Sequence, residues 1–128
     1  MIGYAVVGSN DVEKAGRFFD PLVEMLGARR VHSFDRGIFY GVDGFELAVL
    51  TPFDGNAAAP GNGNMVALQA PSREVVDSAY TLTLELGGSE EGEPGIRGRE
   101  ASGFYGAYFR DPEGNKFCVF RISPPDCG

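Results

Sequence analysis

Apolar residues along this chain follow two alternating patterns, and the same order of patterns occurs twice. An apolar run at residues 2–8 predicts a short buried strand. Apolar side chains at helical spacing continue to Leu26, and Gly27 stands where a helix would end. Three more strands are predicted at residues 29–33, 37–42 and 46–50, separated by polar turns. The first half therefore predicts the element order βαβββ.

The predicted first helix has a defined start and one interruption. Asn10, followed three residues later by Glu13, is typical of a capping box in which Asn10 is the N-cap and Glu13 reaches back to it. Pro21 lies inside the helical pattern and has no backbone N–H to donate. We therefore expect a kink in this helix, or a frayed first half.

The second half repeats the order of the first. Residues 65–70 predict a strand, Ser72 is the expected cap of a second helix, and Gly88 ends that helix as Gly27 ends the first. Two strands are predicted near residues 105–110 and 116–122.

The match between the halves is weakest after the second helix. Residues 94–103 are polar and rich in glycine where the first half has an apolar strand, so most of this stretch is predicted to be a loop. Loops of this length often cover a binding site. The sequence Asp-Pro-Glu-Gly-Asn at residues 111–115 predicts the tight turn between the last two strands.

These elements predict a single α+β domain over residues 1–128, built from two tandem βαβββ modules. Module 1 covers about residues 1–52, residues 53–63 form a linker, and module 2 covers about residues 64–123. Each module has only one helix to cover its sheet, so neither half is expected to be stable alone.

Net charge and composition exclude some classes of binding partner. The formal net charge of −7 disfavours phosphate backbones and anionic lipid, so we expect no nucleic acid and no membrane partner. Two cysteines, Cys118 and Cys127, do not form a disulfide framework and fit a reducing compartment. The N-terminus lacks a basic signal region, and no apolar run is long enough to span a membrane. A cytoplasmic location is expected.

Several motifs together resemble those of one superfamily. They are the Ser-Asn-Asp-Val-Glu-Lys-Ala segment at residues 9–15 leading into Phe-Phe-Asp at 18–20, Leu-Gly-Ala at 26–28, Pro-Gly-Asn-Gly at 60–63, and the aromatic strand and turn at 104–115. This pattern resembles the glyoxalase / bleomycin-resistance / extradiol-dioxygenase superfamily, also called the vicinal oxygen chelate family. The resemblance covers nearly the whole chain.

The resemblance implies a fold and a type of site. Each βαβββ unit is expected to form a cupped mixed sheet, and the pair of units encloses a cleft. Members commonly hold a divalent metal there with His or Gln on the first strand, His on the fifth and Glu on the eighth, and glyoxalase I types add a Glu on the fourth strand. That metal acts as a Lewis acid on two vicinal oxygens of the substrate. Members are often homodimers, and a homodimer is expected here.

This sequence departs from the metal-binding pattern at three of the four positions. They carry Tyr4, Met65 and Cys118, and only Glu46 retains a ligand type of the family. A phenol, a thioether, a thiol and one carboxylate are a poor set for a hard divalent cation. We therefore predict no metal ligands and no cofactor, with a divalent metal possible only if the substituted site still binds one.

Strand alternation predicts which side chains line the cleft. Side chains on the opposite face of these strands, including Val49, Phe117 and Val119, are expected to pack under the helices. Arg97 in the polar loop is added because an arginine there can clamp a carboxylate or phosphate, although scattered arginines are usually solvated. A collapsed core without a ligand is the alternative reading of this face. The predicted cleft consists of Tyr4, Val6, Glu46, Ala48, Met65, Ala67, Arg97, Tyr108, Cys118 and Phe120.

Four of the chemically active side chains have two readings each. Glu46 is a candidate general base if it is buried, or a solvated carboxylate if it lies at a strand edge. Cys118 lacks a histidine nearby in sequence and is expected to be a buried inert thiol rather than a nucleophile. His32, the single histidine, is expected to have a structural or surface role rather than to bind a metal. Tyr108 either orients a ligand oxygen, together with Tyr4, or packs as an aromatic.

Two functions from different classes remain open. The leading hypothesis is a metal-independent small-molecule binding protein of the glyoxalase/bleomycin-resistance type with a degenerate metal site. The alternative is an enzyme that uses Glu46, either a lyase or isomerase of the glyoxalase I (lactoylglutathione lyase-like) type or a dioxygenase-related enzyme. A purely structural or interaction module would instead have a filled cleft.

Overall fold

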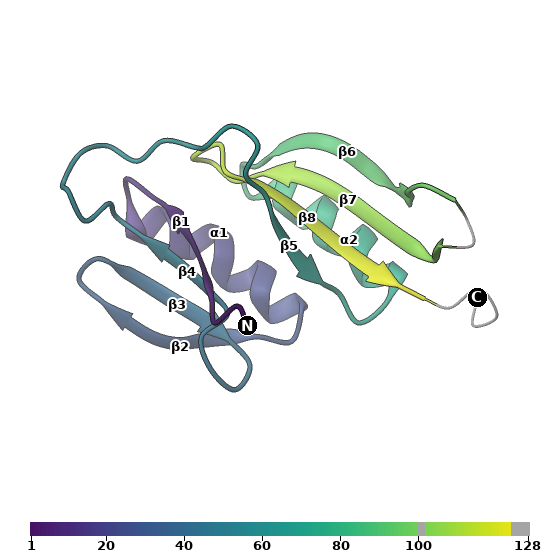
Figure 1. Cartoon of the computed structure of the whole chain (residues 1–128), viewed down its shortest axis with the longest axis horizontal. Helices are drawn as coiled ribbons and strands as arrows, with labels where there is room; N and C mark the ends of the chain where they lie inside the picture. The colour runs from purple at the N-terminus through teal and green to yellow at the C-terminus, as the bar shows by residue number, and fades with distance from the viewer. Residues whose placement is uncertain (100–101, 124–128) are drawn as a thin grey trace.

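The computed structural model describes residues 1–99 and 102–123, and Cys127 therefore lies outside the described residues. Two sheets lie side by side with a helix behind each (Figure 1). No helix in this described part of the chain has the length and apolar character that crossing a bilayer requires. In chain order the elements are β1 (Ala5–Gly8), α1 (Val12–Met25), β2 (Arg29–Phe34), β3 (Gly37–Gly41), β4 (Leu47–Leu50), β5 (Val66–Gln69), α2 (Arg73–Glu85), β6 (Ser89–Ile96), β7 (Phe104–Arg110) and β8 (Lys116–Ile122).

The sheet topology confirms the predicted α+β fold of two tandem βαβββ modules. The first sheet has the order β1-β4-β3-β2, and the second has the equivalent order β5-β8-β7-β6. In both sheets the first strand pairs with the last in parallel, and the remaining pairs are antiparallel. The register places Val6 beside Ala48 in module 1 and Ala67 beside Cys118 in module 2.

One continuous core joins the two modules. The helix-facing side chains of both sheets, including Val49, Phe117 and Val119, are buried beneath α1 and α2 as the alternation predicted. Phe18 and Phe19 on α1 reach across to the second sheet, where the ring of Phe19 lies 5.4 Å from that of Phe117. The opposite, concave faces of both sheets carry no helix (Figure 1).

The start of α1 differs from the prediction by one residue. Asp11, not Asn10, is the N-cap, and its side chain accepts the hydrogen bond from the amide of Lys14. Asn10 instead uses its side chain in the linker, where its Oδ1 accepts from the amide of Ala58 at 2.7 Å. A tertiary contact therefore overrides the local capping signal.

Pro21 neither frays α1 nor ends it, because the helix runs from Val12 to Met25 through this residue. The residues around Pro21, Phe19 and Leu22 among them, are almost completely buried. Asp20 adds a polar anchor, since it pairs with Arg30 at 2.8 Å and accepts from the buried hydroxyl of Tyr40 at 2.7 Å. Packing and this ion pair hold the turn that proline alone would weaken.

The polar stretch after α2 also differs from the prediction. Residues 89–96 form the strand β6, so of the predicted loop at 94–103 the described residues 97–99 and 102–103 lie outside a strand. β6 is an edge strand that pairs with β7 through two irregular registers around Gly92. Main-chain pairing creates this strand without an apolar pattern, which is why periodicity did not reveal it.

The turn at residues 111–115 connects the modules as well as two strands. Gly114 adopts a φ of +93°, and the Asp111 carboxylate accepts from the amides of Glu113 and Asn115. The side chain of Asn115 then donates to the carbonyl of Gly8 at 2.9 Å, at the end of β1. The carboxylate of Glu113 accepts from the backbone and side-chain nitrogens of Asn10. The motif that carried the family resemblance is thus a clamp between the two modules.

We expect Asn115→Ala to destabilise the whole chain rather than module 2 alone. The substitution leaves the Gly8 carbonyl and one Asp111 oxygen without their donor in a site that is only 9% exposed. An unsatisfied buried group of this kind costs about 1–3 kcal/mol of unfolding free energy. Urea unfolding followed by circular dichroism measures this loss, with Asn62→Ala in the exposed linker as the matched control. Equal stability of the two variants would contradict the clamp.

Candidate functional site

The hollowed part of the molecule lies between the edge strands β1 and β5, and we call this region the seam. The two strands belong to different sheets and are each the first strand of their module. A hollow of about 730 Å³ occupies one end, with the end of α1 beneath it. A second hollow of about 480 Å³ occupies the other end, and Met65 and Val66 line both. The seam is therefore one continuous groove with two widenings.

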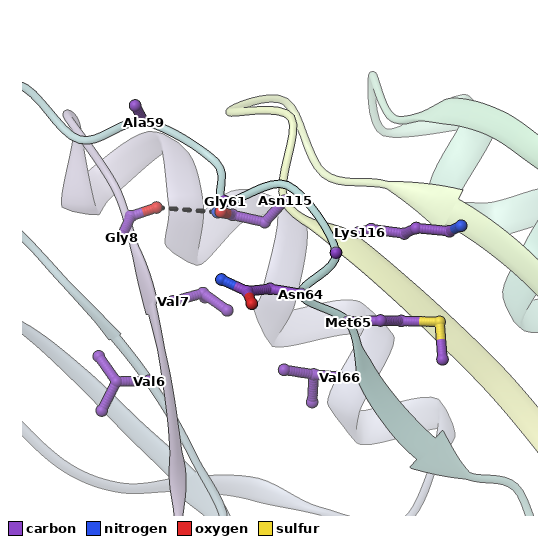
Figure 2. Close-up of a pocket in the computed structure, with 11 residues that line it drawn as sticks. Val6, Val7, Gly8, Ala59, Gly61, Asn64, Met65, Val66, Asn115 and Lys116 are labelled. Carbon is purple, nitrogen blue, oxygen red and sulfur yellow. Dashed lines mark hydrogen bonds between the residues drawn. The ribbon is translucent and has the colours of Figure 1, made fainter.

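Figure 2 shows the smaller hollow, which is closed on one side by the linker. Val7 and Val66 point toward each other from β1 and β5, and Asn64 projects between the strands. The clamp hydrogen bond from Asn115 to the Gly8 carbonyl crosses this end. This end is mainly polar and its shape depends on the linker.

The larger hollow brings together half of the predicted cleft residues. Tyr4 and Glu46 come from module 1, while Met65, Ala67 and Phe120 come from module 2. Side chains from the two modules therefore share one cavity. Val6, by contrast, lines the smaller hollow.

The concave face of module 1 is aromatic. Phe39 stacks on Phe45 with centroids 4.2 Å apart, and the ring of Tyr4 meets both edge-on. His32 is exposed and stacks against Phe34 and Phe45, which fits the structural or surface role expected for it. Ala48, predicted to line the cleft, is completely buried and offers a ligand no surface.

The concave face of module 2 combines an aromatic ring with positive charge. Tyr108 stands at its centre, between Gly92 on β6 and Cys118 on β8. The guanidinium carbon of Arg97 lies 5.2 Å from the centroid of the Tyr108 ring, and Nζ of Lys116 lies 5.7 Å from it. We call Arg97, Tyr108 and Lys116 the Tyr108 cluster.

Burial keeps the two ionisable acids at this centre in their neutral forms. Desolvation raises the pKa of the Tyr108 hydroxyl, and the neighbouring Cys118 adds to the rise while Arg97 opposes it. Desolvation likewise raises the pKa of the Cys118 thiol, with Tyr108 and the two nearby cations opposing. Because the thiolate is the reactive form, Cys118 is not set up as a nucleophile.

Glu46 lies at the rim of the larger hollow and is exposed. Its carboxylate accepts a hydrogen bond from the amide of Val42 at 2.8 Å, which closes the loop between β3 and β4. This contact favours the reading of Glu46 as a solvated, loop-capping carboxylate.

The residues at the family's metal positions do not fit a hard divalent cation. Across residues 1–99 and 102–123 no group of three or more His, Cys, Asp or Glu side chains is placed to hold a metal ion. Tyr4 is engaged with aromatic rings, Met65 offers only a thioether, and Cys118 is a buried thiol with a raised pKa. Hard cations select carboxylate and carbonyl oxygens, and Zn²⁺, Ni²⁺ and Fe²⁺ are also bound by imidazole; of these ligand types the set has only the carboxylate of Glu46.

Sequence reasoning missed two parts of this surface. Lys116 stands two residues before Cys118 on β8, so the alternation that selected Cys118 also selects Lys116. The aromatic group of Phe34, Phe39 and Phe45 carried no comparable signal, because Phe45 lies in a loop and β2 was not assigned a face. Their convergence is a tertiary property.

The comparisons agree with this architecture. The model of the Glyoxalase/Bleomycin resistance protein/Dioxygenase superfamily matches residues 1–119. A glyoxalase/bleomycin resistance protein from Albidiferax ferrireducens is 33% identical, with a TM-score of 0.85 over 94% of this chain and 98% of that one. No curated protein matches the sequence.

More distant structures share the fold. A glyoxalase-related enzyme from Fulvimarina pelagi is 22% identical, with a TM-score of 0.72 over 94% of this chain and 86% of that one. A genomically encoded fosfomycin resistance protein from Listeria monocytogenes is 19% identical, with a TM-score of 0.64 over 94% and 91% of the two chains. With the family model spanning nearly the whole sequence, this chain belongs to the Glyoxalase/Bleomycin resistance protein/Dioxygenase superfamily.

Proposed function

We propose that this protein binds a small organic molecule in the larger hollow of the seam without a metal ion. The observation that carries the proposal is the hollow of about 730 Å³, whose lining is mainly apolar and includes Met65 and Phe120. Small-molecule sites typically have volumes of about 300–1,000 Å³ and an apolar lining with a few polar groups. Tyr4 and Glu46 supply such groups here.

Metal independence is supported by donor chemistry. Three of the four expected ligand positions carry side chains that hard cations do not select, and Cys118 is held as a neutral thiol. A ligand in this seam is therefore recognised through apolar contact and hydrogen bonds rather than through chelation.

We further propose a homodimer in which the concave faces are covered by the second copy. Apolar side chains on these faces are unusually exposed, with Val6 at 54%, Tyr4 at 47% and Met65 at 46%. Contiguous exposed apolar surface of this kind marks an interaction site in most soluble proteins. The exposure of Phe34 and Phe45, both 43%, extends the surface across module 1.

A second candidate function is a lyase or isomerase that uses Glu46. The observation in its favour is that Glu46 is the single acidic residue among the described residues that line the larger hollow. Its exposure and its bond to the Val42 amide weaken the case, since a general base needs a free carboxylate aimed at the substrate.

A reducing compartment suits this protein, and we propose the cytoplasm. The described thiol, Cys118, is free and buried. No disulfide therefore involves this residue, as is usual for proteins kept under reducing conditions.

Filling the larger hollow should abolish ligand binding without unfolding the protein. Ala67 is exposed on the wall of the hollow, so Ala67→Trp places an indole in the cavity at little cost to the core. Titration of the ¹⁵N-labelled chain with benzamide, a neutral aromatic probe, should give saturable amide shifts around Met65 and Phe120 that Ala67→Trp removes. Ala57→Trp in the exposed linker is the control. Identical titrations of the two variants would refute the proposed pocket.

We expect tag-free protein to retain far less than one metal ion per chain after incubation with Ni²⁺, Zn²⁺, Mn²⁺ or Fe²⁺ and dialysis. The reason is the donor set of Tyr4, Met65 and Cys118. Elemental analysis measures the retained metal, and an assay for turnover of α-keto hemithioacetals accompanies it. Stoichiometric metal, or turnover that Glu46→Gln abolishes, would favour the enzyme over the binding protein.

Placing a charge on the concave face should dissociate the dimer. In Val6→Lys the ammonium group would have to be buried between the copies without a partner, which is strongly unfavourable. Sedimentation equilibrium should then change from two chains to one. Leu84→Lys tests a charge on an exposed apolar residue of α2, on the opposite side of the molecule, and should leave the mass unchanged. A wild-type mass of one chain would exclude the homodimer.

A further inference from the structure

We propose that the Tyr108 cluster is the anion-binding end of the site and that its natural ligand carries a carboxylate or a chemically similar small anionic group. The inference rests on the proposed ligand-binding function and specifies the ligand's charge. Arg97 and Lys116 both lie within 6 Å of the centroid of the Tyr108 ring, at 5.2 and 5.7 Å. Two cations therefore converge on one hydroxyl-bearing side chain.

Two other Arg–Tyr pairs in this chain show what the cluster lacks. In the first, the Tyr40 hydroxyl donates to Asp20 at 2.7 Å, and Arg30 pairs with the same carboxylate at 2.8 Å. One aspartate thus satisfies both the arginine and the tyrosine.

The second pair has a carboxylate on its tyrosine, although the arginine does not share it. The guanidinium of Arg73 lies 5.2 Å from the centroid of the Tyr105 ring. The hydroxyl of Tyr105 donates to Asp77 at 2.6 Å. This pair lies on the helix side of the second sheet.

The Tyr108 cluster has no such carboxylate among the described residues. Its tyrosine lies against Cys118, and the guanidinium of Arg97 donates to the main-chain carbonyl of Glu93. The buried Nε of Arg97 has no hydrogen-bond partner in the described part of the chain, as is also true of the Nε atoms of Arg36 and Arg73, so the missing carboxylate on the tyrosine is what sets this cluster apart. Lys116 adds a second cation, so the cluster has positive charge and unused donors but no anion.

Glu91, an acid of the described residues near this cluster, is already engaged. Glu91 pairs with Arg110, the third cation of this face, and that contact holds the pKa of the Glu91 carboxyl below its usual range. Lys116 also contributes to the lowered pKa of the Glu91 carboxyl, so its charge is partly offset there, whereas no acidic side chain among the described residues pairs with Arg97. The chain has a net charge of −7, and the field of that charge repels anions. A local excess of positive charge therefore favours anion binding at the cluster over the rest of the surface.

The backbone leaves room for these side chains. A Cβ at Gly92 would lie 3.0 Å from Cδ2 of Tyr108 and 3.3 Å from an Nη atom of Arg97. Glycine at this bulge in β6 therefore lets both side chains lie across the strand. Gly106 and the stacked rings of Phe104 and Phe120 continue the face on the other side of Tyr108.

These neighbours define the rest of the ligand. Phe120, two residues beyond Cys118 on β8, lines the larger hollow of the seam, and Lys116 lines the smaller one, so the cluster lies beside the seam. The complementary ligand has one anionic group for Arg97, Lys116 and the Tyr108 hydroxyl, and a compact apolar or aromatic body for the hollow. Charge-assisted hydrogen bonds at the first end and burial at the second would act together.

The test compares two probes of nearly equal shape. Benzoate and benzamide are titrated into the ¹⁵N-labelled full-length chain at constant ionic strength, and amide shifts give both affinities. We expect benzoate to bind at least about tenfold more tightly than benzamide, the discrimination expected of charge-assisted hydrogen bonds. The preference should decrease as sodium chloride is added.

Single substitutions test whether the preference for benzoate over benzamide comes from the Tyr108 cluster. Lys116→Met, Arg97→Met and Tyr108→Phe should each remove most of the preference for benzoate while retaining benzamide binding. The Lys116 side chain donates no hydrogen bond among the described residues, so its substitution leaves the pairing of β8 intact and keeps the test valid even if Arg97→Met disturbs β6. Arg99→Met removes an exposed cation from the same loop and should change nothing.

The outcomes separate the two proposals. Equal binding of benzoate and benzamide would refute the anion site and leave the binding function standing. No saturable shift with either probe would overturn both. A benzoate preference that Arg99→Met reduces as much as Lys116→Met would also refute the assignment, because it would then reflect general charge.

Discussion

The packing of Phe18 and Phe19 between the two sheets is the constraint on which the rest of the molecule depends. Both rings lie on α1, the helix of module 1, yet they contact Phe109 and Phe117 of module 2 at centroid distances of 6.3 and 5.4 Å. Each sheet is covered by its own helix, and this contact joins the two covered sides into one core. The modules are therefore held edge to edge, with both helices on one side and both concave faces on the other.

This arrangement creates the seam. Because α1 is shared, β1 and β5 are brought close without joining into one sheet, and the space between them becomes a groove with the end of α1 beneath it. The clamp from Asn115 and Glu113 then fixes the other end of β1. The site is thus a consequence of how two small modules stabilise each other, and a stability defect in the clamp would also alter the shape of the site.

The sequence predicted the fold well because the fold is encoded in local periodicity. Strands, helices and the turn at residues 111–115 follow apolar alternation, caps and turn residues, which need no knowledge of partners. The N-cap was wrong by one residue because Asn10 has a competing contact with Ala58, far away in the sequence. The strand β6 was missed because an edge strand is formed by main-chain pairing with β7 and needs no apolar pattern.

The residues of the site were harder to predict, because their exposure depends on contacts between parts of the chain that are distant in sequence. Alternation selected Tyr108, Cys118 and Phe120, but it also selected Ala48, which is completely buried. Whether an inward-facing residue is exposed depends on the size of its neighbours, which periodicity does not record. Lys116 was within reach of the method, since it lies on the same face as Cys118.

Replacing the family's metal ligands changes the chemistry that the proposed site can perform. A divalent metal both attracts ligand oxygens and activates them as a Lewis acid. In this chain the positive charge comes from Arg97 and Lys116, which lie beside Tyr108, itself the neighbour of Cys118 at a former ligand position. Guanidinium and ammonium groups attract an anionic oxygen and donate hydrogen bonds to it, but they do not lower the pKa of bound water as a metal does. Recognition of an oxygen-bearing ligand can therefore persist after the activation of that ligand has been lost, which is why a binding protein is the reading that the concave face favours over an enzyme.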